Sequence, residues 1–296
     1  MPHLQILDGR RIHYEASTRS AGANTTALVF HHGQPGAAVL WEPMVEHAAR
    51  YGWGLVTLSR PGYASSDRMP GRMVADVASD VGAVLDHLGY RRFVTAGWSG
   101  GGPHALACSA LLDTRCAAAA TIAGVAPYEG VDDLDWTAGM GPENVEEFQA
   151  LIAGDPGLEG RVGELMSSLR HIQPSQLVDA LGGLLSPPDK QALVGDVAEF
   201  LAAWMRLAAS SGSAGYWDDD VAFIRYWGFD LGDIAIPVTV WRAGQDLMVP
   251  PAHGEWLAAH IPGSTARFEP DEGHISLFSQ RFGEIVDQLA ADAGVS

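Results

Sequence analysis

The sequence predicts an α/β protein with a doubly wound, mostly parallel sheet of about eight strands and a helical cap inserted between two of them. Three observations favour this class. Short apolar runs alternate with amphipathic helical stretches, which is typical of a parallel sheet covered on both faces. The first 15 residues have the pattern of a hairpin, and the pattern between about residues 126 and 233 is helical only.

Each predicted strand is a short apolar or alternating run next to turn residues such as Asp8-Gly9. In chain order the predicted strands are His3–Leu7, Arg11–Glu15, Ala27–His31, Leu55–Leu58, Phe93–Ala96, Ala117–Ala123, Val238–Arg242 and Thr265–Phe268. The helices between them place apolar residues three or four positions apart, as a buried helix face requires. They are Pro43–Tyr51, Arg72–Leu88, Gly101–Leu112, Ala252–His260 and Gln280–Ala290.

The helical stretch predicts two domains, a core of residues 1–125 and 234–296 and a cap, or lid, of residues 126–233. Three apolar helix faces fall within the cap, and the helix carrying the third begins at Ser186, where Pro187 suits a first helical turn. The cap carries 19 acidic and 5 basic residues, against 17 and 13 in the core. Solvated outer helix faces are one interpretation of this charge. The alternative is a field over the site entrance that disfavours anionic substrates.

The net charge of −18 restricts the partners, because an acidic surface repels nucleic-acid backbones and anionic lipid headgroups. We expect a small-molecule substrate, neutral or cationic rather than anionic, and neither nucleic acid nor a membrane; a homodimer is left open. The two cysteines, Cys108 and Cys116, belong to no metal-ligand pattern, so we expect reduced thiols, no metal and no cofactor. No apolar run suits a signal peptide or a membrane span, which predicts a cytoplasmic protein.

The clearest chemical motif is the G-x-S-x-G pattern of Gly97-Trp98-Ser99-Gly100-Gly101. A predicted strand comes directly before it and a predicted helix directly after it, so Ser99 should stand on a sharp turn at the edge of the sheet. The glycines leave room for neighbouring backbone. We therefore predict that Ser99 is a nucleophile whose hydroxyl lies near the positive end of a helix.

A serine nucleophile needs a base, and the base needs an acid that orients it. His274 lies between the last predicted strand and the last predicted helix, in a loop that can bring it to the carboxyl edge of the sheet. Asp246 follows the last strand but one and reaches the same edge. The order Ser99, Asp246, His274 predicts a catalytic triad. Asp271 and Glu272 lie too close to His274 along the chain to support it from behind.

A tetrahedral intermediate also requires backbone N–H donors. One donor is expected from Gly100, the residue after the nucleophile. The other is expected from residues 31–36, His31-His32-Gly33-Gln34-Pro35-Gly36, which we call the oxyanion loop. Gln34 is the expected donor there, because Pro35 has no N–H. For His32, a place as a buried, hydrogen-bonded anchor of the loop is favoured over contact with substrate or metal.

Together these motifs resemble those of the α/β-hydrolase superfamily. The matches span about residues 27–282 and are His32-Gly33-Gln34-Pro35-Gly36, Ser59-Arg60-Pro61-Gly62-Tyr63-Ala64-Ser65-Ser66-Asp67, the serine motif, Gly244-Gln245-Asp246 with Val249-Pro250, and Gly273-His274. The resemblance implies the α/β-hydrolase fold, with a helical lid where this chain has its insertion, and a cofactor-free serine hydrolase. Ser59 stands where relatives usually have Asp, a departure that concerns the loop and not the triad. Proline iminopeptidase relatives resemble the chain in the oxyanion loop, but their elbow has Trp after the serine rather than before it.

The triad and the resemblance predict hydrolysis of a carboxylic ester or related acyl bond through an acyl-enzyme intermediate. Aminopeptidase, lactonase, C–C bond hydrolase and acyltransferase activities on the same triad remain alternatives, as does a non-catalytic small-molecule receptor on the same fold. Epoxide hydrolase and haloalkane dehalogenase activities are disfavoured, because those relatives have Asp in place of Ser99.

The substrate pocket is expected to include Trp98, which adjoins the nucleophile. Three further candidates, for which a place in the core is favoured, are Met248, Trp136 and Trp204. Three aromatic residues are instead expected to seat the cap on the core: Tyr216, Trp217 and Phe223.

Overall fold

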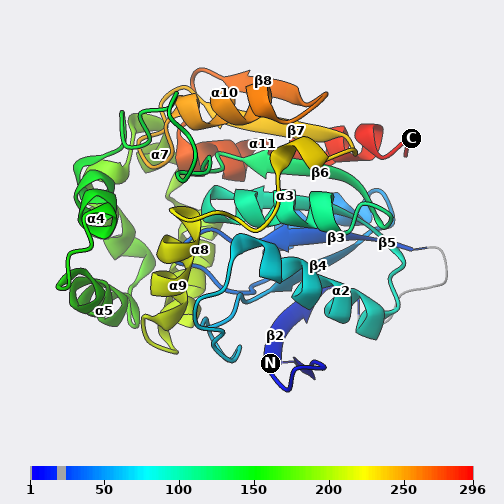
Figure 1. The fold of residues 1–296 in the computed structure, drawn as a ribbon, viewed down its shortest axis with the longest axis horizontal. Coiled ribbons are helices and arrows are strands. Elements are labelled where there is room, and N and C mark those ends of the chain that lie inside the picture. The colour runs from blue at the N-terminus through cyan, green and yellow to red at the C-terminus, as the bar shows by residue number, and fades with distance from the viewer. Residues whose placement is uncertain (1, 19–24, 296) are drawn as a thin grey trace.

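The computed structural model describes residues 2–18 and 25–295, and a central sheet runs through the molecule (Figure 1). Its eight described strands lie in the order β1-β2-β4-β3-β5-β6-β7-β8. They are β1 (His3–Gln5), β2 (Arg11–Ala16), β3 (Thr26–His31), β4 (Gly54–Leu58), β5 (Arg92–Trp98), β6 (Cys116–Ile122), β7 (Val238–Ala243) and β8 (Thr265–Glu269). Strand β2 pairs antiparallel with β1 and β4, and the other described pairs are parallel. The predicted doubly wound, mostly parallel sheet is confirmed.

Helices cover both faces of the sheet, so its central strands are largely buried. Helix α3 (Gly102–Leu111) packs on β5 and β6 beside α2 (Val77–Leu88). On the other face α11 (His274–Asp292) packs on β6 and β7 beside α1 (Glu42–Ala49). Helix α10 (Pro251–His260) packs on β7 and β8 from the face that carries α3: Gly254 lies against the Arg242 side chain, whereas Thr239 on the opposite face of β7 bonds to Asp292 of α11. In the described part of the chain, no helix is both long and apolar enough to cross a bilayer.

The segment between β6 and β7 contains six α-helices among its described residues, and these lie beyond one end of the sheet, at the left of Figure 1. They are α4 (Pro142–Ile152), α5 (Leu158–Leu169), α6 (Leu177–Leu181), α7 (Pro187–Ala192), α8 (Gly195–Ala209) and α9 (Ala214–Phe223). We keep the name cap for residues 126–233; their division from the core as a domain stays a prediction.

Several helix boundaries differ from the predicted ones: the helix predicted from Arg72, for example, begins at Val77, after a 3₁₀ turn at Val74–Asp76. Two further differences bear on the site. The helix expected from Ser186 onward is two helices, because Val194 is extended and Gly195 has a φ of 54°, a left-handed conformation that glycine favours. The last helix begins at His274 and not at Gln280, so His274 is a helical residue rather than a loop residue. The cause is a tertiary contact at the start of α11, described below.

The cap's acidity is not confined to solvated helix faces. Asp218, Asp219 and Asp220 of α9 are buried, as is Asp189 of α7. Buried carboxylates require hydrogen bonds or counter-charges, so these residues must have partners inside the protein. For them the solvated-face interpretation is wrong.

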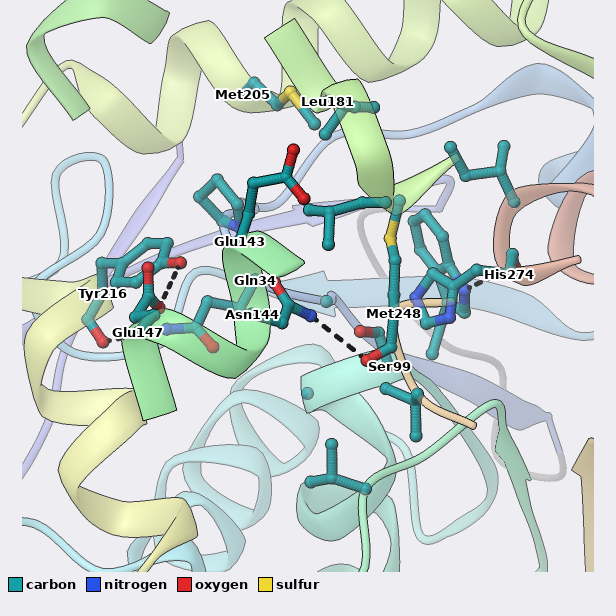
Figure 2. Close-up of a pocket in the computed structure, with 18 of the residues that line it drawn as sticks. Gln34, Ser99, Glu143, Asn144, Glu147, Leu181, Met205, Tyr216, Met248 and His274 are labelled. Carbon is teal, nitrogen blue, oxygen red and sulfur yellow. Dashed lines mark hydrogen bonds between the residues drawn. The ribbon is translucent and has the colours of Figure 1, made fainter. Parts of the chain in front are cut away.

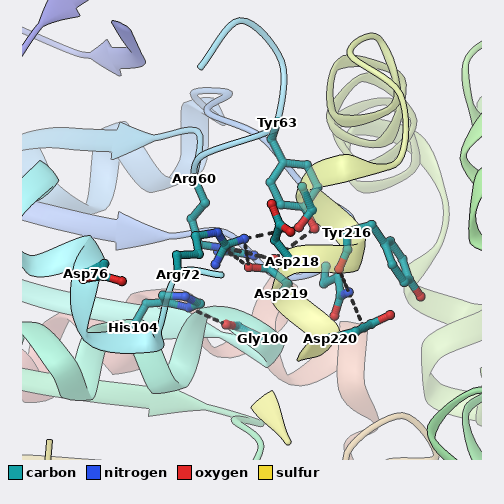
Figure 3. A network of polar contacts seen from close by, with 12 residues as sticks. Arg60, Tyr63, Arg72, Asp76, Gly100, His104, Tyr216, Asp218, Asp219 and Asp220 are labelled. Carbon is teal, nitrogen blue, oxygen red and sulfur yellow. Dashed lines mark hydrogen bonds and ion pairs between the residues drawn. The ribbon is translucent and has the colours of Figure 1, made fainter. Parts of the chain in front are cut away.

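A buried ion cluster around Asp219 joins the cap to the core (Figure 3). Its carboxylate accepts hydrogen bonds from the guanidinium groups of Arg60 and Arg72, and from the Tyr63 hydroxyl at 2.9 Å. Burial by itself would raise the pKa of Asp219. The charges of Arg60 and Arg72 outweigh burial and hold that pKa well below its usual range.

Arg60 extends this cluster to the oxyanion loop. Its guanidinium group donates to the carbonyl oxygen of His32 and, at 3.1 Å, to that of Gly33. One side chain therefore contacts both a cap carboxylate and the backbone of the loop. The position of α9 and the conformation of the oxyanion loop are linked through it.

Replacing Asp219 with Asn should lower the free energy of unfolding by about 3–5 kcal/mol, because two buried guanidinium groups lose their counter-charge. Denaturant titration measures the loss. The control is Asp218→Asn in the same helix: Asp218 pairs with Arg68, whose side chain is 41% exposed. That variant should lose about 1 kcal/mol or less. Equal losses in the two variants would contradict the role assigned to the cluster.

The turn from β5 into α3 brings three backbone segments into contact. Ser99 has a φ of 57°, in the left-handed region that costs a non-glycine residue about 1–3 kcal/mol. A Cβ atom at Gly97 would overlap the carbonyl group of Gly101, and a Cβ atom at Gly101 would overlap that of His31. The end of β3, the turn and the start of α3 can therefore meet only with glycine at both positions.

A methyl group at the second of these positions tests the close approach. Gly101→Ala should destabilise the protein by about 1–3 kcal/mol through overpacking against backbone. Gly82→Ala is the control: a Cβ atom at this helical glycine would meet nothing within 4 Å. It should stabilise the protein by about 0.5–1 kcal/mol. Thermal unfolding of the two variants should shift in opposite directions, and a shift in the same direction would refute the assignment.

Candidate active site

Ser99 lies where β5 ends, at the first position of a 3₁₀ turn (Ser99–Gly101) that leads into α3. It lines a cavity of about 200 Å³ between core and cap (Figure 2). The core contributes residues from the carboxyl end of the sheet, and the cap contributes residues of α4, α5, α6, α8 and α9. The strained turn therefore presents the serine to an enclosed space rather than to open solvent.

His274 and Asp246 form a buried hydrogen-bonded pair. The Nδ1 atom of His274 lies 2.7 Å from Oδ2 of Asp246, and Oδ1 of Asp246 accepts the backbone N–H groups of Met248 and Val249, each at 2.8 Å. Burial raises the pKa of Asp246 above its usual value, and the hydrogen bond from His274 opposes that rise. With Asp246 ionised, Nδ1–H is the donor, which leaves Nε2 with a free lone pair.

His274 also borders the cavity that contains Ser99. Trp98, the residue before Ser99, contacts His274 directly: its indole N–H donates to the backbone oxygen of His274 at 3.2 Å, and its ring centroid is 5.2 Å from that of the imidazole. In the described structure no hydrogen bond joins the Ser99 hydroxyl to the imidazole. The link between nucleophile and base thus stays a prediction, while the acid and base are in direct contact.

The oxyanion loop lies against the serine turn. A Cβ atom on Gly33 would sit 3.1 Å from the Ser99 Cβ atom, and one on Gly100 would sit 3.4 Å from the Gln34 Cβ atom. The two residues expected to donate N–H groups are therefore neighbours across the turn, and both line the cavity. The Gln34 side chain holds the loop to α9, because Nε2 donates to the Tyr216 backbone oxygen at 3.0 Å and to Asp220 Oδ1 at 2.6 Å.

His32 does not line the cavity. Its Nδ1 atom is 2.8 Å from the Gly33 carbonyl oxygen, and its Nε2 atom accepts the Arg60 backbone N–H at 3.1 Å. Burial, reinforced by the charge of Arg60, lowers the pKa of His32 well below its usual value. The geometry is that of a neutral anchor within the loop.

The other predicted pocket residues divide into two groups. Trp98, Trp204 and Met248 line the cavity, and the rings of Trp98 and Trp204 stack with centroids 5.2 Å apart. Trp136 is buried elsewhere and donates its indole N–H to the Ala126 backbone oxygen at 2.8 Å. Two aromatic residues expected only to seat the cap also line the cavity: Tyr216 and Phe223.

A polar stretch of the cavity wall was missed at the sequence level. Glu143, Asn144 and Glu147 of α4 line the cavity. Glu147 accepts a hydrogen bond from the Tyr216 hydroxyl at 2.8 Å, and burial raises the pKa of Glu147. These residues adjoin the apolar face of an acidic helix, so the pattern alone could not distinguish them from a solvated face.

Within residues 2–18 and 25–295, no group of three or more His, Cys, Asp or Glu side chains could hold a metal ion. The polar groups at the cavity are instead a hydroxyl, an imidazole–carboxylate pair, backbone N–H groups and the carboxyl groups of Glu143 and Glu147, which we call the acidic wall. This set can perform nucleophilic acyl chemistry.

Comparison with known proteins agrees with this architecture. Residues 26–156 match a family described as alpha/beta hydrolase fold. No curated protein sequence matches the chain.

Among solved structures, a hydrolase from Pseudomonas aeruginosa is 19% identical with a TM-score of 0.69, covering 99% of this chain and 98% of its own. A thermophilic esterase from Thermogutta terrifontis is 18% identical with a TM-score of 0.68, covering 99% of each chain. An enol-lactonase from Burkholderia xenovorans is 18% identical with a TM-score of 0.67, covering 99% of this chain and 100% of its own. With the family match over residues 26–156 and the order of the sheet, these similarities show that the chain has the α/β-hydrolase fold.

Proposed function

We propose that this protein is a serine hydrolase that cleaves a carboxylic ester or related acyl bond. The observation that carries the proposal is the buried His274–Asp246 pair at the cavity that also contains Ser99 on its strained turn. A nucleophile, a base and an orienting acid at one cavity are the parts that acyl transfer to serine requires.

In the proposed mechanism, the Ser99 hydroxyl attacks the substrate carbonyl while Nε2 of His274 takes its proton. The backbone N–H groups of Gln34 and Gly100 stabilise the oxyanion of the tetrahedral intermediate. Collapse of the intermediate expels the alcohol, which receives the proton from His274, and leaves an acyl-serine. Water, deprotonated by His274, then attacks the acyl group, releases the carboxylic acid and restores the Ser99 hydroxyl.

The cavity walls suggest the kind of substrate. Aromatic and aliphatic side chains such as Trp204, Phe223 and Leu201 favour a small apolar acyl or alcohol group. The acidic wall, Glu143 and Glu147, favours a neutral or cationic substrate over an anionic one. A nucleic acid or membrane partner forms no part of the proposal.

An amide substrate with a free amine is the second candidate, because the same two carboxyl groups could hold an ammonium group in an aminopeptidase reaction. Lactone and C–C bond hydrolysis and acyl transfer would use the same attack by Ser99. A panel of short esters, lactones and prolyl amides distinguishes these reactions, because only the leaving group and the acceptor differ.

Ser99→Ala should lower kcat for a p-nitrophenyl ester by at least about 1,000-fold and abolish labelling by a fluorophosphonate probe, since the attacking oxygen is lost. Ser168→Ala is the control: the Ser168 hydroxyl donates only to the Leu165 backbone oxygen. It should retain wild-type labelling. Failure of the wild-type protein to label would favour the non-catalytic receptor, and an active Ser99→Ala variant would end the triad assignment.

Glu147→Gln should reduce the preference for an ammonium-bearing ester over a neutral isostere by about tenfold, the value of one charged hydrogen bond. The glutamine can still accept the Tyr216 hydroxyl, so the wall keeps its shape. In the wild-type protein the preference should increase with pH, because burial raises the pKa of Glu147 and its contribution to the charge of the wall appears only as that group ionises.

The measurement is kcat/KM for matched cationic, neutral and anionic esters. The control is Glu146→Gln, which removes an exposed charge from the neighbouring position of α4. If both variants keep the wild-type selectivity, the acidic wall does not select the substrate.

A further inference from the structure

We propose that Asp189, a buried carboxylate of the cap, is a positioning residue for His274. This inference rests on the proposed function. Asp189 Oδ2 accepts the His274 backbone N–H at 3.2 Å. Asp189 Oδ1 accepts the backbone N–H groups of Ile275 at 2.7 Å and of Ser276 at 3.0 Å. A single side chain of α7 thus binds the first three N–H groups of α11.

These N–H groups need such a partner. The first N–H groups of a helix have no carbonyl partner within it, and the positive end of the helix dipole favours an anion there. The residue at the usual capping position is Gly273, which has no side chain to supply one. Asp189 takes that place from a segment that lies 85 residues earlier in the chain.

The local packing is built around this carboxylate. A Cβ atom on Gly273 would overlap Ser186 Oγ and crowd both carboxylate oxygens of Asp189, so the missing side chain makes room for the cap residue. The Ser186 hydroxyl donates to Asp189 Oδ2 at 2.8 Å. Asp189 is fully buried and forms no ion pair with any residue that the structure describes. Its charge is therefore stabilised by hydrogen bonds, chiefly those from α11.

The consequence concerns the direction of the His274 side chain. His274 is the first residue of α11, so the hydrogen bond to Asp189 orients its backbone N–H, and with it the bond from Cα to Cβ. Its carbonyl oxygen is bound by Trp98 and its imidazole by Asp246. Only the bond to Asp189 comes from the cap. Movement of α7 away from the core would leave buried N–H groups unpaired and release the base.

The experiment measures kcat and KM for a small neutral ester, together with the labelling rate of Ser99, for each variant per folded molecule. Asp189→Ala should lower kcat and the labelling rate by about 100-fold, the effect of a catalytic group displaced by about 1 Å, with little change in KM. Asp189→Asn keeps the volume and one acceptor oxygen, so it should fall between alanine and wild type. If Asp189→Ala does not fold, Asp189→Asn decides.

The control is Asp218→Asn, which weakens a different contact between cap and core, the ion pair with Arg68, without touching α11. It should keep the wild-type kcat even where its stability falls. Wild-type kcat in folded Asp189→Ala, or in folded Asp189→Asn where only that variant folds, would overturn the proposal. The proposal would also be overturned if the Asp189 variant and Asp218→Asn, compared at equal stability, lost the same fraction of kcat.

A spectroscopic signal separates this proposal from the proposed function. The proton between His274 Nδ1 and Asp246 should give a low-field NMR resonance, identified by its loss in His274→Gln. Removing the Asp189 carboxylate should shift or broaden it, and Asp218→Asn should not. If the wild-type protein neither hydrolyses esters nor labels, the proposed function fails. In that case the NMR resonance alone tests the positioning role of Asp189, and an unchanged resonance in the Asp189 variant would refute that role.

Discussion

The close approach of backbone at the serine turn is the constraint on which the rest of the site depends. Ser99 can occupy a left-handed conformation between β5 and α3 only because Gly97 and Gly101 lack side chains. The same two glycines let the end of β3 lie against the turn, which brings the oxyanion loop beside the serine. The strain at Ser99 is therefore maintained by the packing of three segments, and the chemistry proposed for Ser99 depends on it.

The cap completes this arrangement through two buried carboxylates that act on different parts of the core. Asp219 binds Arg60, which in turn binds the carbonyl groups of the oxyanion loop. Asp189 binds the backbone N–H groups at the start of α11, where His274 lies. Separation of the cap from the core would break both contacts. It would leave the guanidinium group of Arg60 without its counter-charge and the first N–H groups of α11 without an acceptor, which is unfavourable for buried groups. Cap position and site geometry are thus expected to change together.

Periodicity and turn residues were enough to predict the fold, because the central strands β3 to β7 are largely buried runs and helices such as α2 place their buried residues on one stripe. The predicted strand at residues 93–96 lies within β5, and the predicted helix Gly101–Leu112 exceeds α3 by one residue at each end, so the serine turn was located correctly. His274 was expected in a loop and is helical, because the first N–H groups of its helix are bound by Asp189, a residue far away along the chain. The helix expected from Ser186 is interrupted at Gly195, whose backbone conformation no helical pattern reveals.

By itself the sequence determined the parallel sheet, the position of the serine turn and the choice of Asp246 over Asp271 and Glu272 as the partner of His274, because these follow from local pattern and chain order. Only the tertiary structure decided which acidic residues of the cap are buried, which of them face the cavity, and what holds His274 in place. The physical reason is that a carboxylate in a helical pattern has the same spacing whether it faces water or a buried cation. Its role depends on partners that lie far away along the chain.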